Sequence, residues 1–174
     1  PKNAYVNTIE HIDAEVGRLL KALDDLKLVD NTYVIYTTDN GPWLQFRHHG
    51  GSAGPLREGK GTTFEGGQRV PCVMRGPGIP AGTVCDELTG TIDVLPTIAA
   101  LTGTPLPAGN KIDGLDASGL WKGTTKKSPR KEFLHYTSRG DLEGIRSGNW
   151  KLLVKKPRRN NARKAQLHLF DLAK

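Results

Sequence analysis

Apolar side chains recur at steps of three and four along residues 5–28. This spacing places them on one face of a helix, so it predicts an amphipathic helix over this segment. Acidic side chains near its start, Glu10 and Asp13 among them, suit the positive end of the helix dipole. The apolar positions are Tyr5, Ile9, Ile12, Val16, Leu19, Leu20, Leu23 and Leu26.

Two short apolar runs predict strands at residues 32–38 and 70–75. The first run is too apolar to face water on either side, which is typical of a strand inside a mostly parallel sheet. Cys72 lies in the second run, and we expect its thiol to be buried in the core. Because a helix, a short connection and a buried strand form an αβ unit, the sequence predicts an α/β fold with a mostly parallel, mixed sheet flanked by helices.

Shorter elements are expected in the middle of the chain. Residues 88–91 predict a short strand, and residues 118–121 predict a helical turn. A helix is predicted at 93–101, with Asp93 as its cap and Gly103 at its end.

The last part of the chain has the pattern of an antiparallel sheet. Strands are predicted at 132–137 and 166–171, and a hairpin at 144–154 with Ser-Gly-Asn at its turn. The composition changes to proline and glycine ahead of these elements, which marks a boundary. We therefore predict one domain over residues 1–107 and a small antiparallel sheet subdomain over residues 108–174.

Candidate metal ligands stand directly after the first predicted strand. Residues 40–69 are rich in glycine and poor in apolar side chains, so we expect a long functional loop there. Asp39 and Asn40 stand at its start, and both supply oxygen, which calcium and magnesium prefer as a ligand. An ordinary Asp-Asn-Gly turn without a metal is the alternative. Two ligands also do not complete a metal shell.

The same loop carries a candidate anion-binding lysine. Lys60 lies between Gly59 and Gly61, where a lysine and nearby backbone N–H groups can neutralise an oxyanion. An exposed lysine without a ligand is the alternative. His48 and His49 lie in the same loop, and two interpretations stay open for them: proton donation to a leaving group, or ordinary exposed loop histidines.

Charge and composition bound the class of protein. The chain has 174 residues and a net charge of +7, with much of the positive excess between Lys155 and Lys164. These basic residues form either a solvated loop or a surface that attracts a polyanion such as an acidic glycan. No aromatic residues interleave with them, which disfavours nucleic-acid binding. No apolar run is long enough to span a membrane.

The chain shows no activated nucleophile. Cys72 and Cys85 form neither a CxxC pair nor a zinc spacing, and no serine stands in a G-x-S-x-G elbow. The candidate metal ligands and the anion-binding loop together indicate a site for a charged ester. Because half a metal shell and no nucleophile make an incomplete site, we expect the chain to be a piece of a longer protein.

Several motifs, in order, resemble one known family. The chain looks like the carboxyl-terminal portion of a type I sulfatase, of the arylsulfatase group within the alkaline phosphatase superfamily. The resemblance covers essentially the whole chain. The matching segments are Thr38–Gly41, Gly59–Pro71, Asp93–Thr97, Asp113–Asp116, Arg146–Leu152 and Leu169–Leu172.

The resemblance implies an alkaline-phosphatase-like fold and the hydrolysis of sulfate esters. Members of this family use a formylglycine made from a cysteine, which attacks sulfur as a gem-diol, and a calcium ion, sometimes assigned as magnesium. Asp39 and Asn40 match two of the metal ligands. Lys60 matches the lysine that contacts the sulfate and steadies the leaving oxygen. A sulfated small molecule or sulfated glycan is the implied substrate, and the family is typically exported to the periplasm, the extracellular space or the lysosome.

The chain departs from the family pattern at the nucleophile. The modifiable cysteine has an arginine four residues later, whereas Cys72 has Arg75 three residues later and Cys85 has Thr89 in that place. We therefore expect the parent protein to be a sulfatase and this chain alone to be inactive.

Other interpretations stay open. One is a phosphatase or phosphonate hydrolase of the same superfamily, although Asn40 favours the sulfatase arrangement over the histidine that many of those enzymes have. The other is a non-catalytic module that binds acidic glycans. We also expect an isolated piece of this sheet to self-associate unless the rest of the protein covers it.

Overall fold

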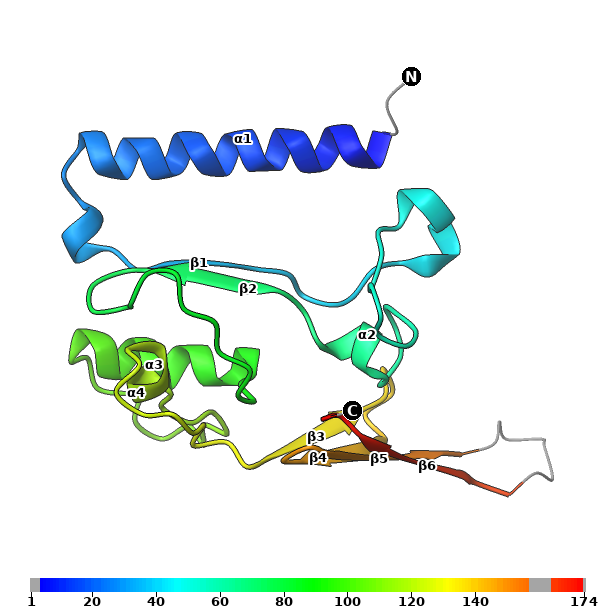
Figure 1. Cartoon of the computed structure of the whole chain (residues 1–174). Helices are drawn as coiled ribbons and strands as arrows, with labels where there is room; N and C mark the ends of the chain where they lie inside the picture. The colour runs from blue at the N-terminus through cyan, green and yellow to red at the C-terminus, as the bar shows by residue number, and fades with distance from the viewer. Residues whose placement is uncertain (1–3, 157–163, 174) are drawn as a thin grey trace. The chain divides into compact units, whose positions relative to one another are not determined.

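The computed structural model describes residues 4–156 and 164–173 and begins with one long helix, α1 (Ala4–Asp25) (Figure 1). A 3₁₀ turn, η1 (Val29–Asn31), leads from it to the first strand. The helix predicted at 5–28 is therefore confirmed, and it ends three residues early because the chain tightens into the turn. Its apolar face is largely exposed in this chain, with Ile9 at 45% and Leu19 at 55%.

The chain divides into two compact units. One contains the residues up to Pro77 together with Tyr136–Asp141, and the other contains Gly78–His135 and the residues from Leu142 onward. The domain boundary predicted at 107/108 stays a prediction.

The first unit holds a two-stranded sheet of β1 (Val34–Thr37) and β2 (Cys72–Arg75) (Figure 1). The strands are antiparallel, in a register that pairs Val34 with Arg75 and Thr37 with Cys72. The expectation of a mostly parallel sheet is not confirmed, because the chain between the two strands returns β2 along β1 in the opposite direction.

Two predictions about burial in this sheet are wrong. The side chain of Tyr36 in β1 is 47% exposed, so this strand is not buried on both faces. Cys72 is also exposed rather than buried in the core. The physical reason is that β1 and β2 pair only with each other among the described residues, which leaves both strands as sheet edges.

The second unit contains short helices and a four-stranded sheet. The strand predicted at 88–91 is wrong, because Thr91 already begins the turn η3 (Thr91–Asp93). The helix α3 (Val94–Thr102) follows and ends at Gly103, whose φ of 66° is the left-handed conformation that glycine adopts readily. The predicted helical turn is confirmed as α4 (Ser118–Trp121).

The antiparallel sheet near the end of the chain is confirmed. Its strands are β3 (Glu132–Tyr136), β4 (Leu142–Ser147), β5 (Trp150–Lys155) and β6 (Gln166–Asp171), in that spatial order (Figure 1). The predicted hairpin closes through Gly148, at φ 55°, between the paired residues Ser147 and Trp150. Lys155 contacts the Glu143 carboxylate at 2.6 Å, while the basic residues at 157–163 lie outside the described residues.

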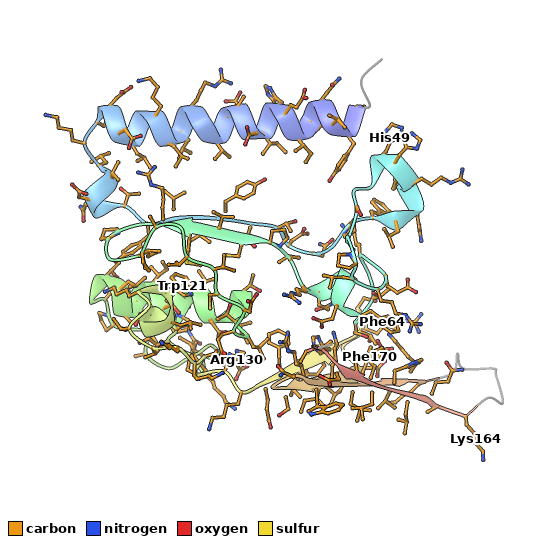
Figure 2. All side chains as sticks on the ribbon, in the orientation of Figure 1. His49, Phe64, Trp121, Arg130, Lys164 and Phe170 are labelled. Carbon is orange, nitrogen blue, oxygen red and sulfur yellow. The ribbon has the colours of Figure 1, made fainter. Side chains whose placement is uncertain are left out.

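A buried ion pair joins distant segments of the second unit. Asp93 is 1% exposed, and its carboxylate accepts hydrogen bonds from the amides of Gly90 at 2.9 Å and Leu115 at 2.8 Å. Arg130, which is labelled in Figure 2, lies in the same unit. It donates to the same carboxylate, with its Nε 2.8 Å from Oδ2, and its Nη2 also donates to the carbonyl of Asp113. Burial alone would raise the pKa of Asp93, but these hydrogen bonds, led by those from Arg130, hold the pKa of its carboxyl below the ordinary value.

Asp93 precedes α3 as predicted, but its side chain does not cap the helix. The carboxylate instead binds the segments around it, and the Asp93 carbonyl accepts a hydrogen bond from the Thr97 hydroxyl at 2.6 Å. The Thr97 hydroxyl oxygen accepts in turn from the Ala117 amide at 2.9 Å. These contacts tie α3 to the chain that leads into α4.

We predict that Asp93→Ala lowers the free energy of unfolding by about 3–5 kcal/mol, because it leaves the Arg130 charge largely buried without its partner. Because the folded-state pKa of Asp93 lies below the unfolded value of about 3.9, its contribution is fully present above that pH. It is lost as pH falls through the folded-state pKa. Urea denaturation at a series of pH values measures both effects.

The exposed Asp86 provides the matched control. Asp86→Ala is expected to change the free energy of unfolding by less than about 0.5 kcal/mol at every pH. An equal loss in the two variants would contradict the structural role of the Asp93–Arg130 pair.

Candidate functional site

The carboxyl end of β1 presents the two candidate metal ligands. The strand ends at Thr37, and the chain turns at Asp39 and Asn40. The Thr38 hydroxyl lies 3.4 Å from both Asp39 Oδ1 and the carbonyl oxygen of Asn40, which supports the turn from within. Asp39 is exposed and Asn40 is half-buried.

Backbone hydrogen bonds join this turn to the lysine loop. The Gly41 amide donates to the Gly67 carbonyl at 3.1 Å, and the Lys60 amide donates to the Pro42 carbonyl at 2.9 Å. The structure therefore brings Asn40 and Lys60 to the same end of β1, although they lie twenty residues apart in the sequence.

Glycine makes this close approach possible. A Cβ atom on Gly41 would collide with the carbonyl oxygen of Gly66, and one on Gly66 would collide with the carbonyl oxygens of Arg57 and Glu58. Gly59 is buried, and a Cβ there would collide with the carbonyl oxygen of Pro42. A side chain at Gly41 or Gly59 would push the two segments apart, and one at Gly66 would disrupt the lysine loop itself.

The loop around Lys60 is held by its own hydrogen bonds. The Thr62 amide and hydroxyl both donate to the Gly59 carbonyl, at 3.2 and 2.9 Å. Gln68, at the end of α2 (Glu65–Gln68), donates from Nε2 to the Thr62 carbonyl at 2.9 Å. Glu58 has a φ of 63°, which is uncommon for a residue with a side chain. Such conformations cluster at functional sites.

The Lys60 side chain is exposed and directed to an aromatic ring. Its Nζ lies 5.4 Å from the centroid of the Trp43 ring, within the range of a cation–π interaction. No sequence motif identified Trp43 as part of this site. Its position beside Lys60 follows from the hydrogen bond between the Lys60 amide and the Pro42 carbonyl, which only the folded chain shows.

The donor set at Asp39 and Asn40 fits a hard divalent cation. A carboxylate and an amide oxygen are donors that calcium and magnesium prefer, and calcium takes about six to eight oxygens. Within residues 4–156 and 164–173, no group of three or more histidine, cysteine, aspartate or glutamate side chains is arranged to hold a metal. These two donors alone do not complete the six to eight oxygens of a calcium shell.

The two loop histidines contact each other, and neither cysteine forms a disulfide. His48 and His49 are at the end of the turn η2 (Leu44–His49), and their rings lie against each other with centroids 4.1 Å apart. Cys72 and Cys85 are free thiols. Although the Cys72 side chain is exposed, the protein atoms around its sulfur partly desolvate the thiol and raise its pKa, despite the hydrogen bond with Thr37. A raised pKa is the opposite of an activated nucleophile.

Comparison with known proteins identifies the family. Residues 1–104 match the family model "Sulfatase". The chain belongs to the sulfatase family. The match includes Asp39, Asn40 and Lys60, as well as α3 of the second unit.

Among the relatives of this sulfatase chain are two mammalian proteins. It is 43% identical over 154 residues to human "Arylsulfatase A", covering 86% of the chain and 30% of the relative. It is 40% identical over 152 residues to mouse "Steryl-sulfatase", covering 84% of the chain and 24% of the relative.

Two solved structures are similar to the sulfatase chain. The PsFucS1 sulfatase from Pseudoalteromonas sp. matches with a TM-score of 0.77 and 30% identity, over 94% of this chain and 35% of that one. A structure whose description refers to the metabolism of multiple glycosaminoglycans by Bacteroides thetaiotaomicron matches with a TM-score of 0.75 and 27% identity. The match covers 93% of this chain and 37% of that one. The chain thus spans less than half the length of the proteins it matches.

We predict that Gly41→Ala lowers the free energy of unfolding by about 1–3 kcal/mol, because its methyl group overlaps the Gly66 carbonyl. Urea denaturation measures the loss. Gly17 is the matched control, since it lies in α1 with open space where its Cβ would be. Gly17→Ala is expected to raise the free energy of unfolding by about 0.5–1 kcal/mol, and a similar gain in Gly41→Ala would refute the close contact.

Proposed function

We propose that the protein containing this chain hydrolyses sulfate esters, and that the turn after β1 and the lysine loop form one side of its active site. The observation that carries the proposal is the pair of backbone hydrogen bonds, Gly41 to Gly67 and Lys60 to Pro42. They bring together the two backbone segments that carry the oxygen donors and the lysine. Membership of the sulfatase family supports the same reaction.

Asp39 and Asn40 are the proposed metal ligands in this chain. The exposed carboxylate and the neighbouring amide oxygen bind calcium, with magnesium as the other candidate. The bound ion supplies Lewis-acid chemistry, drawing electron density from the sulfate group. The hydrogen-bonded turn at Thr38 keeps the two donors at the end of the strand before the ion arrives.

Lys60 is the proposed sulfate-contacting residue. Its exposed ammonium group is available to a ligand, and its backbone is fixed by the hydrogen bond to Pro42. A positive charge at this position binds a sulfate oxygen and stabilises the negative charge that develops on the leaving oxygen.

The nucleophile is proposed to lie outside this sequence. Neither Cys72 nor Cys85 has an arginine four residues later, so neither fits the family's formylglycine motif. The isolated chain is accordingly proposed to be inactive. It is also proposed to self-associate.

The substrate is proposed to be a sulfated small molecule or a sulfated glycan. The relatives have names that refer to aryl, steryl and N-acetylgalactosamine sulfates. Export from the cytoplasm is the location that the family resemblance implies. No helix among the described residues is long and apolar enough to cross a membrane.

We predict that Lys60→Ala in the full-length protein lowers kcat/KM for sulfate esters by about 100- to 1,000-fold, the loss seen when one preorganised charge-stabilising donor is removed. The exposed Lys126 is the control, and Lys126→Ala is expected to keep full activity. Steady-state kinetics on sulfate and phosphate esters of the same alcohol measure both. Preferential turnover of the phosphate ester would replace the sulfatase proposal with the phosphatase alternative, and full activity of Lys60→Ala would remove Lys60 from the mechanism.

Metal binding is predicted to depend on Asp39. Asp39→Ala is expected to weaken calcium binding at least about tenfold, because losing a ligand costs no less than losing a residue that orients one. Isothermal titration with calcium, after treatment with a chelator, measures the affinity. Asp30 is exposed in η1, so Asp30→Ala should bind calcium as the wild type does. Equal affinities in the two variants would argue against the proposed ligand.

A further inference from the structure

The Lys60 ammonium group lies next to one aromatic side chain. Nζ lies 5.4 Å from the centroid of the Trp43 ring, and Trp43 is itself 47% exposed. We propose that Trp43 is a positioning residue for Lys60, whose indole face holds the ammonium group where the sulfate binds. This inference rests on the proposed function, because it assigns a means of orienting the charge that this function requires.

A lysine side chain depends more than an arginine on a neighbouring group to hold its charge in one position. Its ammonium group is a compact charge on a flexible four-carbon stem, and an exposed stem samples many rotamers. The backbone of Lys60 is fixed through Pro42, but this bond does not restrain the side chain. An aromatic face within about 6 Å of Nζ favours the rotamers that keep the charge above the ring.

The Trp43 ring is itself held in place. The Trp43 amide donates to the Gly50 carbonyl at 3.0 Å, and the Phe46 amide donates to the Trp43 carbonyl at 3.0 Å. The rings of Trp43 and Phe46 meet edge to face, with centroids 4.5 Å apart and planes at 69°. A Cβ on Gly50 would collide with the Trp43 carbonyl, so glycine is needed where the loop closes.

An aromatic partner orients the charge without neutralising it. In the part of the chain that the structure describes, no acidic side chain forms an ion pair with Lys60. A carboxylate in place of Trp43 would compete with a sulfate oxygen for the ammonium group, whereas the indole ring carries no net charge. With tryptophan at position 43, the positive charge of Lys60 therefore stays available to bind an anion.

A double-mutant cycle in the full-length protein tests the inference. Trp43→Leu removes the aromatic face, and it is expected to lower kcat/KM for aryl sulfates by about two- to thirtyfold, the range of a cation–π contact. Trp43→Phe keeps a π face and should recover most of the loss. In the Lys60→Ala background, Trp43→Leu should cause no further loss, because Trp43 acts through Lys60.

The leaving group provides a readout that a merely structural role would not change. Because Lys60 steadies the leaving oxygen, the loss in Trp43→Leu should grow as the pKa of the leaving phenol rises, in parallel with the loss in Lys60→Ala. Gln45→Ala is the matched loop control, since Gln45 is exposed in the same turn η2 and its side chain has no aromatic ring. Its loss should not depend on the leaving group.

Tryptophan fluorescence provides a test that does not depend on activity. Lys60→Ala should change the emission of the protein that has Trp43, and this change should vanish in the Trp43→Phe background. If Trp43→Leu fails to fold, Trp43→Phe replaces it in the kinetic and fluorescence cycles. The coupling energy between positions 43 and 60 is then expected to be smaller.

The outcomes separate this inference from the proposed function. If Lys60→Ala lowers kcat/KM but Trp43→Leu adds its full loss in that background, the positioning role is overturned and the sulfatase proposal stands. An emission change that persists in the Trp43→Phe background also overturns it. If Lys60→Ala leaves kcat/KM unchanged, the proposed role of Lys60 fails, and the role of Trp43 fails with it.

Discussion

The candidate site depends on one steric constraint, the close approach of two backbone segments. The chain after β1 lies against the lysine loop so tightly that a methyl group on Gly41 would overlap the carbonyl of Gly66. The backbone hydrogen bonds from Gly41 and from Lys60 form only at this separation. The metal-ligand candidates and the lysine therefore come together through backbone contacts, and the glycines are required because they have no Cβ.

Two charged side chains, Asp93 and Lys60, have opposite environments. Asp93 is buried, and its carboxylate is surrounded by hydrogen-bond donors that include Arg130. Such a pair fixes the structure, because breaking it leaves an uncompensated charge in the interior. Lys60 is exposed and contacts an uncharged aromatic ring, so its charge stays available to a ligand. Burial with a counter-charge suits a structural role, and exposure with a neutral support suits anion binding.

Much of the apolar surface of this chain is uncovered. The apolar face of α1 is largely exposed, and β1 and β2 pair only with each other among the described residues. The proteins that match the chain are considerably longer, with the chain spanning 30% of human arylsulfatase A. The proposed ligands Asp39 and Asn40 are two of the six to eight oxygens that calcium takes, so the proposed reaction needs further donors.

The sequence by itself determined the local elements and the candidate chemistry. The period of apolar residues predicts α1, and the alternation with turn residues predicts the sheet of β3 to β6, because these signals depend on neighbours along the chain. Motifs placed Asp39, Asn40 and Lys60 as candidates. Strand direction, the exposure of Cys72 and the contact between Lys60 and Trp43 were decided only by the tertiary structure. They depend on which distant segments meet, and backbone hydrogen bonds between loops leave no periodic trace in the sequence.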